Sequence, residues 1–226
     1  ADLFVVPVTE AFRAGVDGEL LCSPRIDNLT SVYSSIAAIV DAKPDGIAVA
    51  ACLDNEEIGS GTRQGSPDFL HDVMDFVAEK LGIATDKYAE MRNNGMVLSV
   101  DNGHAVHPAH PEKYDPVAKV YMGKGVVVKH HVNYSTDGLT SALFKRVAEL
   151  ADVPVQDYYN NSAVRCGSTL GLATSREIGM KTCDIGIAQL AMHSACETIA
   201  IADVDSMTKV LTAFMSAKLS GNKVSL

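Results

Sequence analysis

The sequence is short of the features that mark several common protein classes. It has no tryptophan, only 6% aromatic residues and no basic cluster, and its 28 acidic residues against 19 basic ones leave a net charge of -9. This balance argues against a nucleic-acid-binding protein. No apolar run approaches the roughly 18 residues of a membrane span, and the N-terminal segment ADLFVVPVTE lacks the basic and apolar regions of a signal peptide.

The cysteines are odd in number, scattered, and never arranged as CxxC: Cys22, Cys52, Cys166, Cys183 and Cys196. Such a pattern favours reduced thiols and an intracellular protein. We therefore expect a cytoplasmic location, with the vacuole or another intracellular compartment as the alternative. The chain of 226 residues, with 47% hydrophobic and 21% charged residues, has the composition of an ordinary globular protein.

Apolar runs suited to buried strands alternate with amphipathic helical patterns along most of the chain. The expected helices cover 26–42, 68–81, 137–151 and 197–219, and the expected strands cover 46–53, 96–100, 126–128 and 182–190. This alternation predicts an α/β fold with a mostly parallel sheet and helices on both of its faces.

Polar side chains follow three of these strands at the point where each strand ends. Glu56 and Glu57 come shortly after 46–53, Asp101 and His104 follow 96–100, and His193 follows 182–190. In parallel α/β sheets, ligands bind beyond the carboxyl ends of the strands. Because Asp27 at the start of the first helix faces the same edge, carboxylates and imidazoles are expected to meet there and bind a divalent metal ion.

Each of these residues also has a structural interpretation. Asp27 could cap a helix, Glu56 and Glu57 could be solvated loop charges, His193 could be a core histidine, and Asp101 with His104 could form a turn. All four explanations must hold at once, at strand ends of one sheet, so we favour the metal site. Two other motifs compete with it: a loose glycine-rich loop at 59–65 that could hold a nucleotide, and the pair His130–His131 as a metal site.

Such a cluster is suited to hydrolysis. Two metal ions about 3.5–4 Å apart can share a bridging water and polarise a carbonyl group. A further carboxylate that is not a ligand must take the proton from the water. Adjacent glutamates suit this division, because neighbouring side chains on a turn point in different directions.

The chain resembles the catalytic domain of aspartyl aminopeptidases, the M18 family of dinuclear metallopeptidases. The resemblance rests on six segments in family order that cover nearly the whole chain: SPRIDN (23–28), DNEEIGS (54–60), SVDNGHAVHP (99–108), YSTDG (134–138), RCGSTLG (165–171) and DIGIAQLAMHS (184–194). It implies a zinc-peptidase-like three-layer sandwich.

The resemblance also implies a role for individual residues. It implies Asp27 as the carboxylate that bridges both metals, Glu57, Asp101 and His193 as further ligands, Glu56 as the general base and His104 as a histidine that contacts the substrate. It further implies a pocket for the substrate side chain, formed by Lys129, Tyr134, Gly167, Ser168 and Thr169. A lysine in that pocket would select acidic side chains by charge.

From this resemblance we expect residues 1–226 to form one catalytic domain of a longer family chain. The family's N-terminal metal-binding histidine and inserted oligomerisation domain are expected to lie outside it. The expected activity is removal of an N-terminal Asp or Glu from peptides with a free N-terminus, using two Zn²⁺, Co²⁺ or Mn²⁺ ions and a metal-bridging water, in a homo-oligomer. The alternatives are a dinuclear aminopeptidase of neutral or basic specificity, and a non-catalytic structural or cargo subunit.

Overall fold

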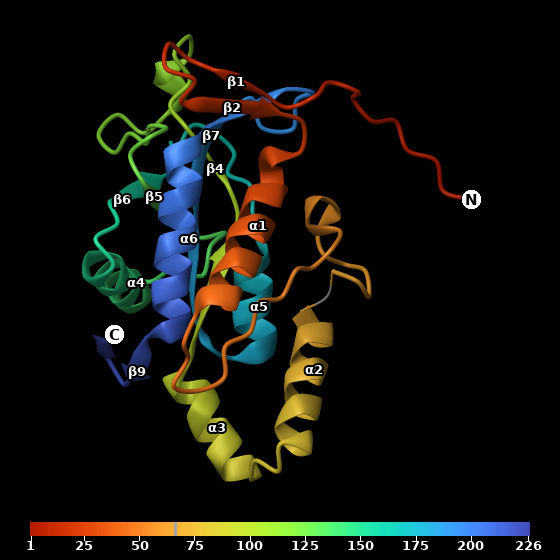
Figure 1. The fold of residues 1–226 in the computed structure, drawn as a ribbon, viewed down its shortest axis with the longest axis vertical. Coiled ribbons are helices and arrows are strands. Elements are labelled where there is room, and N and C mark those ends of the chain that lie inside the picture. The colour runs from red at the N-terminus through yellow and green to blue at the C-terminus, as the bar shows by residue number, and fades with distance from the viewer. Residues whose placement is uncertain (66) are drawn as a thin grey trace.

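A mixed eight-stranded sheet forms the centre of the molecule, which we describe from a computed structural model for residues 1–65 and 67–226 (Figure 1). The strands pair in the order β1-β2-β8-β7-β5-β6, and β3 and β4 also pair with β7. Their bounds are β1 (Phe12–Ala14), β2 (Leu20–Ser23), β3 (Met96–Val100), β4 (Gly103–His104), β5 (Val126–His130), β6 (Val155–Tyr159), β7 (Lys181–Leu190) and β8 (Glu197–Ala200). A separate hairpin joins β9 (Lys218–Ser220) and β10 (Lys223–Ser225).

Six α-helices surround this sheet, together with two short 3₁₀ turns at Glu56–Ile58 and Pro111–Lys113. The helices are α1 (Ile26–Asp41), α2 (Pro67–Lys80), α3 (Thr85–Asn94), α4 (Gly138–Leu150), α5 (Leu170–Ile178) and α6 (Ile201–Ser216). Helices α1 and α6 pack against each other in front of β7 in the view of Figure 1, and α5 contacts β7 and β3.

Strand β7 is buried on both faces, and its alternating side chains serve two different layers. Ile185 and Ile187 point into the main core, which also contains Phe144 of α4 and Val210 of α6. The side chain of Asp184 points the other way, toward the start of α5, where a Cβ on Gly171 would collide with its carboxylate. Helices therefore cover both faces, and the predicted α/β class is confirmed.

The strand pairing is mixed where the sequence pattern predicted a mostly parallel sheet. The pairs β3–β7, β4–β7 and β5–β6 are parallel, whereas β1–β2, β2–β8, β8–β7 and β7–β5 are antiparallel. Short connections explain part of this difference. The loops 15–19 and 191–196 are too short for a crossover, so the strands that they join become antiparallel neighbours.

Two predicted elements need correction. The segment 46–53 is not a strand: it pairs with none of the described strands, and Ile47 and Val49 are each half exposed. Its apolar composition indicated burial, but composition alone does not supply a neighbouring strand. The predicted helix 197–219 begins instead as β8, and α6 starts only at Ile201. The β-branched residues of Glu197–Ala200 suit a strand between two neighbours.

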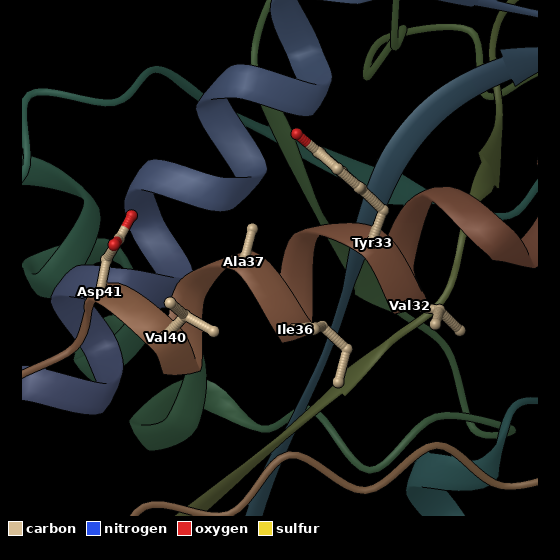
Figure 2. A pocket seen from close by; sticks show the side chains of 6 residues that line it. All are labelled: Val32, Tyr33, Ile36, Ala37, Val40 and Asp41. Atoms are coloured by element: carbon tan, nitrogen blue, oxygen red, sulfur yellow. The ribbon is translucent and has the colours of Figure 1, made fainter.

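Large apolar side chains of α1 lie on its outer side. Leu29 and Val40 are mostly exposed, whereas the buried positions of α1 include the small residues Ser31, Ser34 and Ala38. Small side chains allow the close packing of α1 on α6. The outward side forms a shallow apolar hollow along the C-terminal half of α1, lined by Val32, Tyr33, Ile36, Ala37, Val40 and Asp41 (Figure 2).

Among the described residues, no helix has both the length and the apolar character needed to cross a membrane.

Phe144 tests the position of the core. Its side chain is fully buried, so we expect Phe144→Ala to lower the free energy of unfolding by roughly 3–5 kcal/mol through lost burial and a cavity. Phe69 on α2 is 52% exposed, and we expect Phe69→Ala to change stability by about 0.5 kcal/mol or less. Urea denaturation of both variants measures the difference, and equal losses would contradict this assignment of the core.

Candidate metal centre

Asp27 lies where helix α1 departs from regular geometry. The N-cap position is occupied by Arg25, in the left-handed region with φ 59°, and Asp27 and Asn28 both have non-helical dihedral angles. No side chain makes a capping hydrogen bond here. Asn28 Nδ2 instead donates to the carbonyl of Val100 at 2.9 Å, while the buried Oδ1 of Asp27 has no hydrogen-bond partner in the structure. Asp27 is therefore not a helix cap.

Glu56 and Glu57 lie in a short turn that local hydrogen bonds hold in place. They begin a 3₁₀ turn whose N-cap, Asn55, has φ 62° and donates through Nδ2 to Thr62 Oγ1 at 2.8 Å. Gly59, with φ 92°, closes the turn by donating its N–H to the carbonyl of Glu56 at 2.8 Å. Gly59 thus closes the turn that carries the glutamates, and a Cβ on Gly65 would collide with the carbonyl of Asp54, so both glycines have a structural role without a nucleotide.

Three ligand-bearing side chains meet at one point. His193 Nε2 lies 3.3 Å from Asp27 Oδ2 and 3.1 Å from Glu57 Oε1, and the three ligand atoms all fall within 4.8 Å of one another. The Asp27 side chain is only 4% exposed, whereas those of Glu57 and His193 are 57% and 61% exposed. The cluster is therefore buried on one side and open to solvent on the other, so His193 is not a core histidine.

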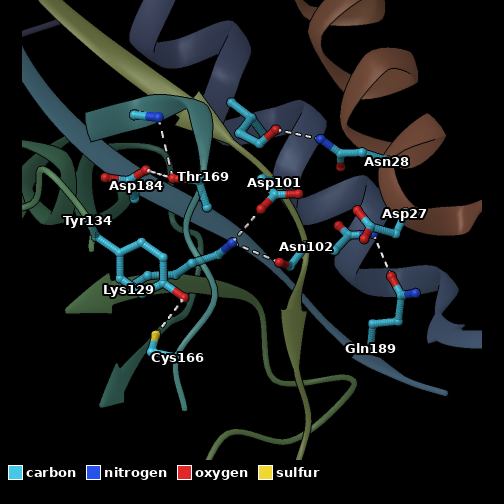
Figure 3. Close-up of polar contacts among 12 residues, drawn as sticks. Asp27, Asn28, Asp101, Asn102, Lys129, Tyr134, Cys166, Thr169, Asp184 and Gln189 are labelled. Atoms are coloured by element: carbon cyan, nitrogen blue, oxygen red, sulfur yellow. Dashed lines mark hydrogen bonds and ion pairs between the residues drawn. The ribbon is translucent and has the colours of Figure 1, made fainter. Parts of the chain in front are cut away.

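Asp101 reaches the same region from the end of β3. Its backbone N–H donates to the carbonyl of Ile185 at 2.9 Å, and Gly186 permits this close approach because any Cβ there would collide with the backbone of Asp101. The ammonium of Lys129 lies between Asp101 Oδ2, at 3.0 Å, and the carbonyl of Asn102, at 2.7 Å (Figure 3). Lys129 is only 2% exposed, so this ion pair is buried.

Burial and mutual repulsion shift the protonation of these groups. Burial, followed by the charges of Asp101 and Glu57, raises the pKa of Asp27 to about 8. The same causes raise the pKa of Glu56 to about 7. The His104 side chain reaches the surface, yet the protein around its ring and the charges of Lys129 and His193 lower its pKa, which favours the neutral imidazole.

The residues predicted to form the substrate pocket lie close to this centre but differ in exposure. The ring of Tyr134 lies 5.6 Å from Lys129 Nζ, and its hydroxyl accepts a weak hydrogen bond from Cys166 Sγ. Gly167 and Ser168 are exposed. Thr169 is buried as the N-cap of α5 and donates its hydroxyl to Asp184, so its side chain is already engaged.

Several groups that shape the centre were not found from the sequence. Glu197 is 2% exposed and accepts hydrogen bonds from the backbone N–H groups of both Asp27 and His193. Asn102 donates to Gln189 Oε1 at 2.7 Å and to Thr30 Oγ1 at 2.9 Å, which joins the end of β3 to β7 and α1. For Glu197, the sequence signal was its position four residues after His193, but that position lay inside a predicted helix.

The competing histidine pair does not join this centre. His130 Nε2 lies 2.9 Å from Asp157 Oδ1, and Lys145 pairs with the same carboxylate. In the part of the chain that the structure describes, the residues placed to hold a metal ion together are Asp27, Glu57 and His193.

The donor set fits a divalent metal ion. Carboxylate oxygens and an imidazole nitrogen are ligands of Zn²⁺, and catalytic zinc sites commonly use three protein ligands. The buried Oδ1 of Asp27 has no hydrogen-bond partner, and a bound cation would offset the cost of burying an unpaired carboxylate oxygen. The fold and the site together define a metal-binding α/β protein.

Comparisons with known proteins identify the family. The model of the family described as aminopeptidase I zinc metalloprotease (M18) matches residues 1–215, and the chain therefore belongs to the M18 family. It is 37% identical over 217 residues to a probable M18 family aminopeptidase 2 of Mycobacterium bovis, covering 92% of this chain and 50% of that protein. A relative of the same name from Clostridium acetobutylicum is 36% identical over 200 residues, covering 87% of this chain and 46% of that protein.

Solved structures agree with this result. The Ape4 chain in a complex with Nbr1 superposes with a TM-score of 0.85 at 30% identity, over 92% of this chain and 41% of that one. The S. cerevisiae mApe1 dodecamer gives a TM-score of 0.72 at 26% identity, over 92% and 48%. A Thermotoga maritima M18 aminopeptidase, at 23% identity and a TM-score of 0.83 over 93% and 49%, shows the same fold. The chain spans about half the length of the curated relatives it matches.

The raised pKa values allow a test in the metal-free chain. The folded state holds the protons of Asp27 and Glu56 more tightly than the unfolded chain, whose values are near 3.8 and 4.5. Their contribution to stability is therefore full below about pH 4 and is lost as the pH rises toward 8. We expect Asp27→Asn to gain stability relative to the parent chain across this range, by on the order of a few kcal/mol.

Urea denaturation at pH 4.5, 6 and 8 with a chelator present measures this effect. Parallel pH dependence in the two proteins would contradict the raised pKa of Asp27.

Proposed function

We propose that this chain supplies the metal-binding catalytic centre of an aminopeptidase that removes an N-terminal residue, Asp or Glu in the first instance, from peptides. The observation that carries the proposal is the convergence of Asp27, Glu57 and His193, with Glu56 beside them, from three separate segments of the chain. A structural role does not require repelling carboxylates to be brought together, because clustering them is unfavourable without a cation.

The chemistry of Glu56 suits a proton shuttle. Its raised pKa, about 7, lets its carboxylate accept a proton from water and return it to a leaving amine near neutral pH. The neutral imidazole of His104 can donate a hydrogen bond to the scissile carbonyl oxygen. The exposed carboxylate of Glu57 can attract the free amino group of a peptide, which favours cleavage at the N-terminus.

The proposed cofactor is a pair of divalent ions, Zn²⁺ first and Co²⁺ or Mn²⁺ as substitutes. Asp27, Glu57 and His193 would hold metal at the cluster, and Asp101 is proposed as a further ligand. When bound, such ions lower the pKa of water and polarise a carbonyl group.

Acidic specificity rests on Lys129, the cation nearest the proposed pocket. A second candidate, neutral specificity, is favoured by the observation that two of the three donors of Lys129 already serve Asp101 and Asn102. Its ammonium is buried, so a substrate carboxylate must use the third donor or displace a partner.

A homo-oligomer is also proposed. It is supported by the similarity to the mApe1 chain, whose structure is that of a dodecamer. A cytoplasmic location stays a prediction that rests on the scattered cysteines.

Substitution of Glu56 tests its role directly. We expect Glu56→Gln to lower kcat by roughly 10²–10⁴-fold, since the amide cannot take the proton, while bound zinc stays the same. Glu79→Gln, an exposed glutamate on α2, serves as the matched control and should retain full activity. Hydrolysis assays with added Zn²⁺ or Co²⁺, together with metal analysis, make the comparison. Full activity of Glu56→Gln would reject this residue as the base.

A panel of peptides that differ only at the N-terminal residue tests specificity. If Lys129 selects the substrate by charge, kcat/KM for N-terminal Asp and Glu should exceed that for Leu and Lys by at least tenfold. A preference for Leu would support the neutral candidate. No cleavage of any peptide by folded, zinc-loaded protein would instead indicate a non-catalytic subunit or an activity that requires further protein.

A further inference from the structure

One buried carboxylate connects two of the proposed metal ligands. Glu197 Oε2 accepts a hydrogen bond from the backbone N–H of Asp27 at 2.9 Å, and its Oε1 accepts one from the backbone N–H of His193 at 2.6 Å. Asp27 and His193 come from opposite ends of the chain and are the residues whose side chains approach to 3.3 Å. The side chain of Glu197 itself is not among the three metal-binding groups.

The sheet explains why Glu197 occupies this place. It is the first residue of β8, which pairs with β2 on one side and β7 on the other. Its partner on β2 is Ser23, the last residue of that strand, and the next residue of β8, Thr198, is opposite Leu190, the last residue of β7. Because β8 runs antiparallel to both neighbours, it begins where they end. Strand β2 leads to Asp27 and β7 leads to His193, so Glu197 lies between the two departing segments.

Both segments have backbone conformations that need support. His193 has φ 66°, and Ala191, two residues before it, has φ 55°; non-glycine residues rarely adopt this left-handed conformation. Asp27 departs from helical geometry two residues after Arg25, whose φ is 59°. A buried acceptor that binds the N–H of each residue fixes the direction in which its side chain leaves the backbone.

We propose that Glu197 is a positioning residue of the metal centre, which holds Asp27 and His193 in the geometry for metal binding through their backbone N–H groups. The inference rests on the proposed function in one respect, that Asp27 and His193 are metal ligands. It adds to that function a group that touches neither metal nor substrate. Supporting groups of this kind typically contribute about 10–100-fold to metal affinity.

Glu197→Gln is the informative substitution. It retains the length and shape of the side chain but replaces one oxygen acceptor by an NH₂ group, which faces a backbone N–H and cannot accept from it. One of the two hydrogen bonds is therefore lost while the volume is kept. Glu197→Asp keeps both acceptors but shortens the reach by one methylene, and it provides a second variant if the first does not fold.

Asp203 offers a matched control within the same fold. It is also buried, at 1% exposure, and its two oxygens accept from the backbone N–H groups of Gly123 and Gly125 at 2.6 and 2.8 Å. These glycines precede β5 and carry no proposed ligand. Asp203→Asn therefore removes the same kind of interaction without touching the segments of Asp27 and His193.

The experiment measures the Zn²⁺ affinity of the whole chain by competition with a chromophoric chelator, without reference to peptidase activity. We expect Glu197→Gln, or Glu197→Asp in its place, to bind Zn²⁺ at least tenfold more weakly than the parent. Asp203→Asn should bind Zn²⁺ with the parent's affinity. Urea denaturation of the metal-free proteins records the stability lost in each variant.

Three outcomes would overturn the proposal. Parent-like affinity in the folded Glu197 variants would show that the carboxylate does not position the ligands. Equal weakening in Asp203→Asn would show that general destabilisation is the cause. A parent chain that binds no zinc would remove the proposed metal centre, and the inference with it. Parent-like zinc affinity in the Glu197 variants alone would leave the aminopeptidase proposal intact.

Discussion

The carboxylates of Asp101 and Glu57 lie close enough to Asp27 and Glu56 to make ionisation of these two residues harder. Without the fold, these carboxylates would repel one another and move apart into water, so the surrounding structure has to hold them together. Much of the local structure serves this purpose: Lys129 is buried against Asp101, Asn102 joins three elements, and Glu197 takes the backbone groups of Asp27 and His193. A divalent cation bound in the centre would offset this repulsion, which gives a physical reason for the carboxylates to lie together.

Stability and the proposed chemistry depend on different parts of the fold. The buried apolar side chains of β5 and β7, such as Val126 and Ile185, form the core with α4 and α6, and they do not take part in the proposed reaction. The reactive groups lie on connecting segments, where left-handed residues such as Asn55 and His193 change the direction of the chain. The rigid sheet fixes where these segments start, and local hydrogen bonds fix where their side chains point.

The sequence predicted helices α1, α2 and α4, strands β3, β5 and β7, and the residues Asp27, Glu57 and His193, because helical periodicity and strand ends are local signals. It did not predict α3, α5, β1, β2 or β6. It was wrong about 46–53, because an apolar run cannot show whether a neighbouring strand will pair with it. Periodicity alone also does not show which side of α1 packs, since the small residues Ser31, Ser34 and Ala38 are the buried ones. Glu197 was missed for a related reason: its importance comes from its two neighbours across the sheet, and those pairings are set by the whole topology.

The pairing of β3 with β7 has a consequence for how the protein is made. Met96 is opposite Lys181 in this parallel pair, and the proposed ligands extend from Asp27 to His193. Contacts between such distant residues form slowly, because a long loop must close before they contribute. During synthesis, a ribosome-bound chain has no complete ligand set until His193 has emerged. The segments of Asp27 and Glu57 are therefore made well before their partner, and the complete centre can bind metal only after His193 has emerged.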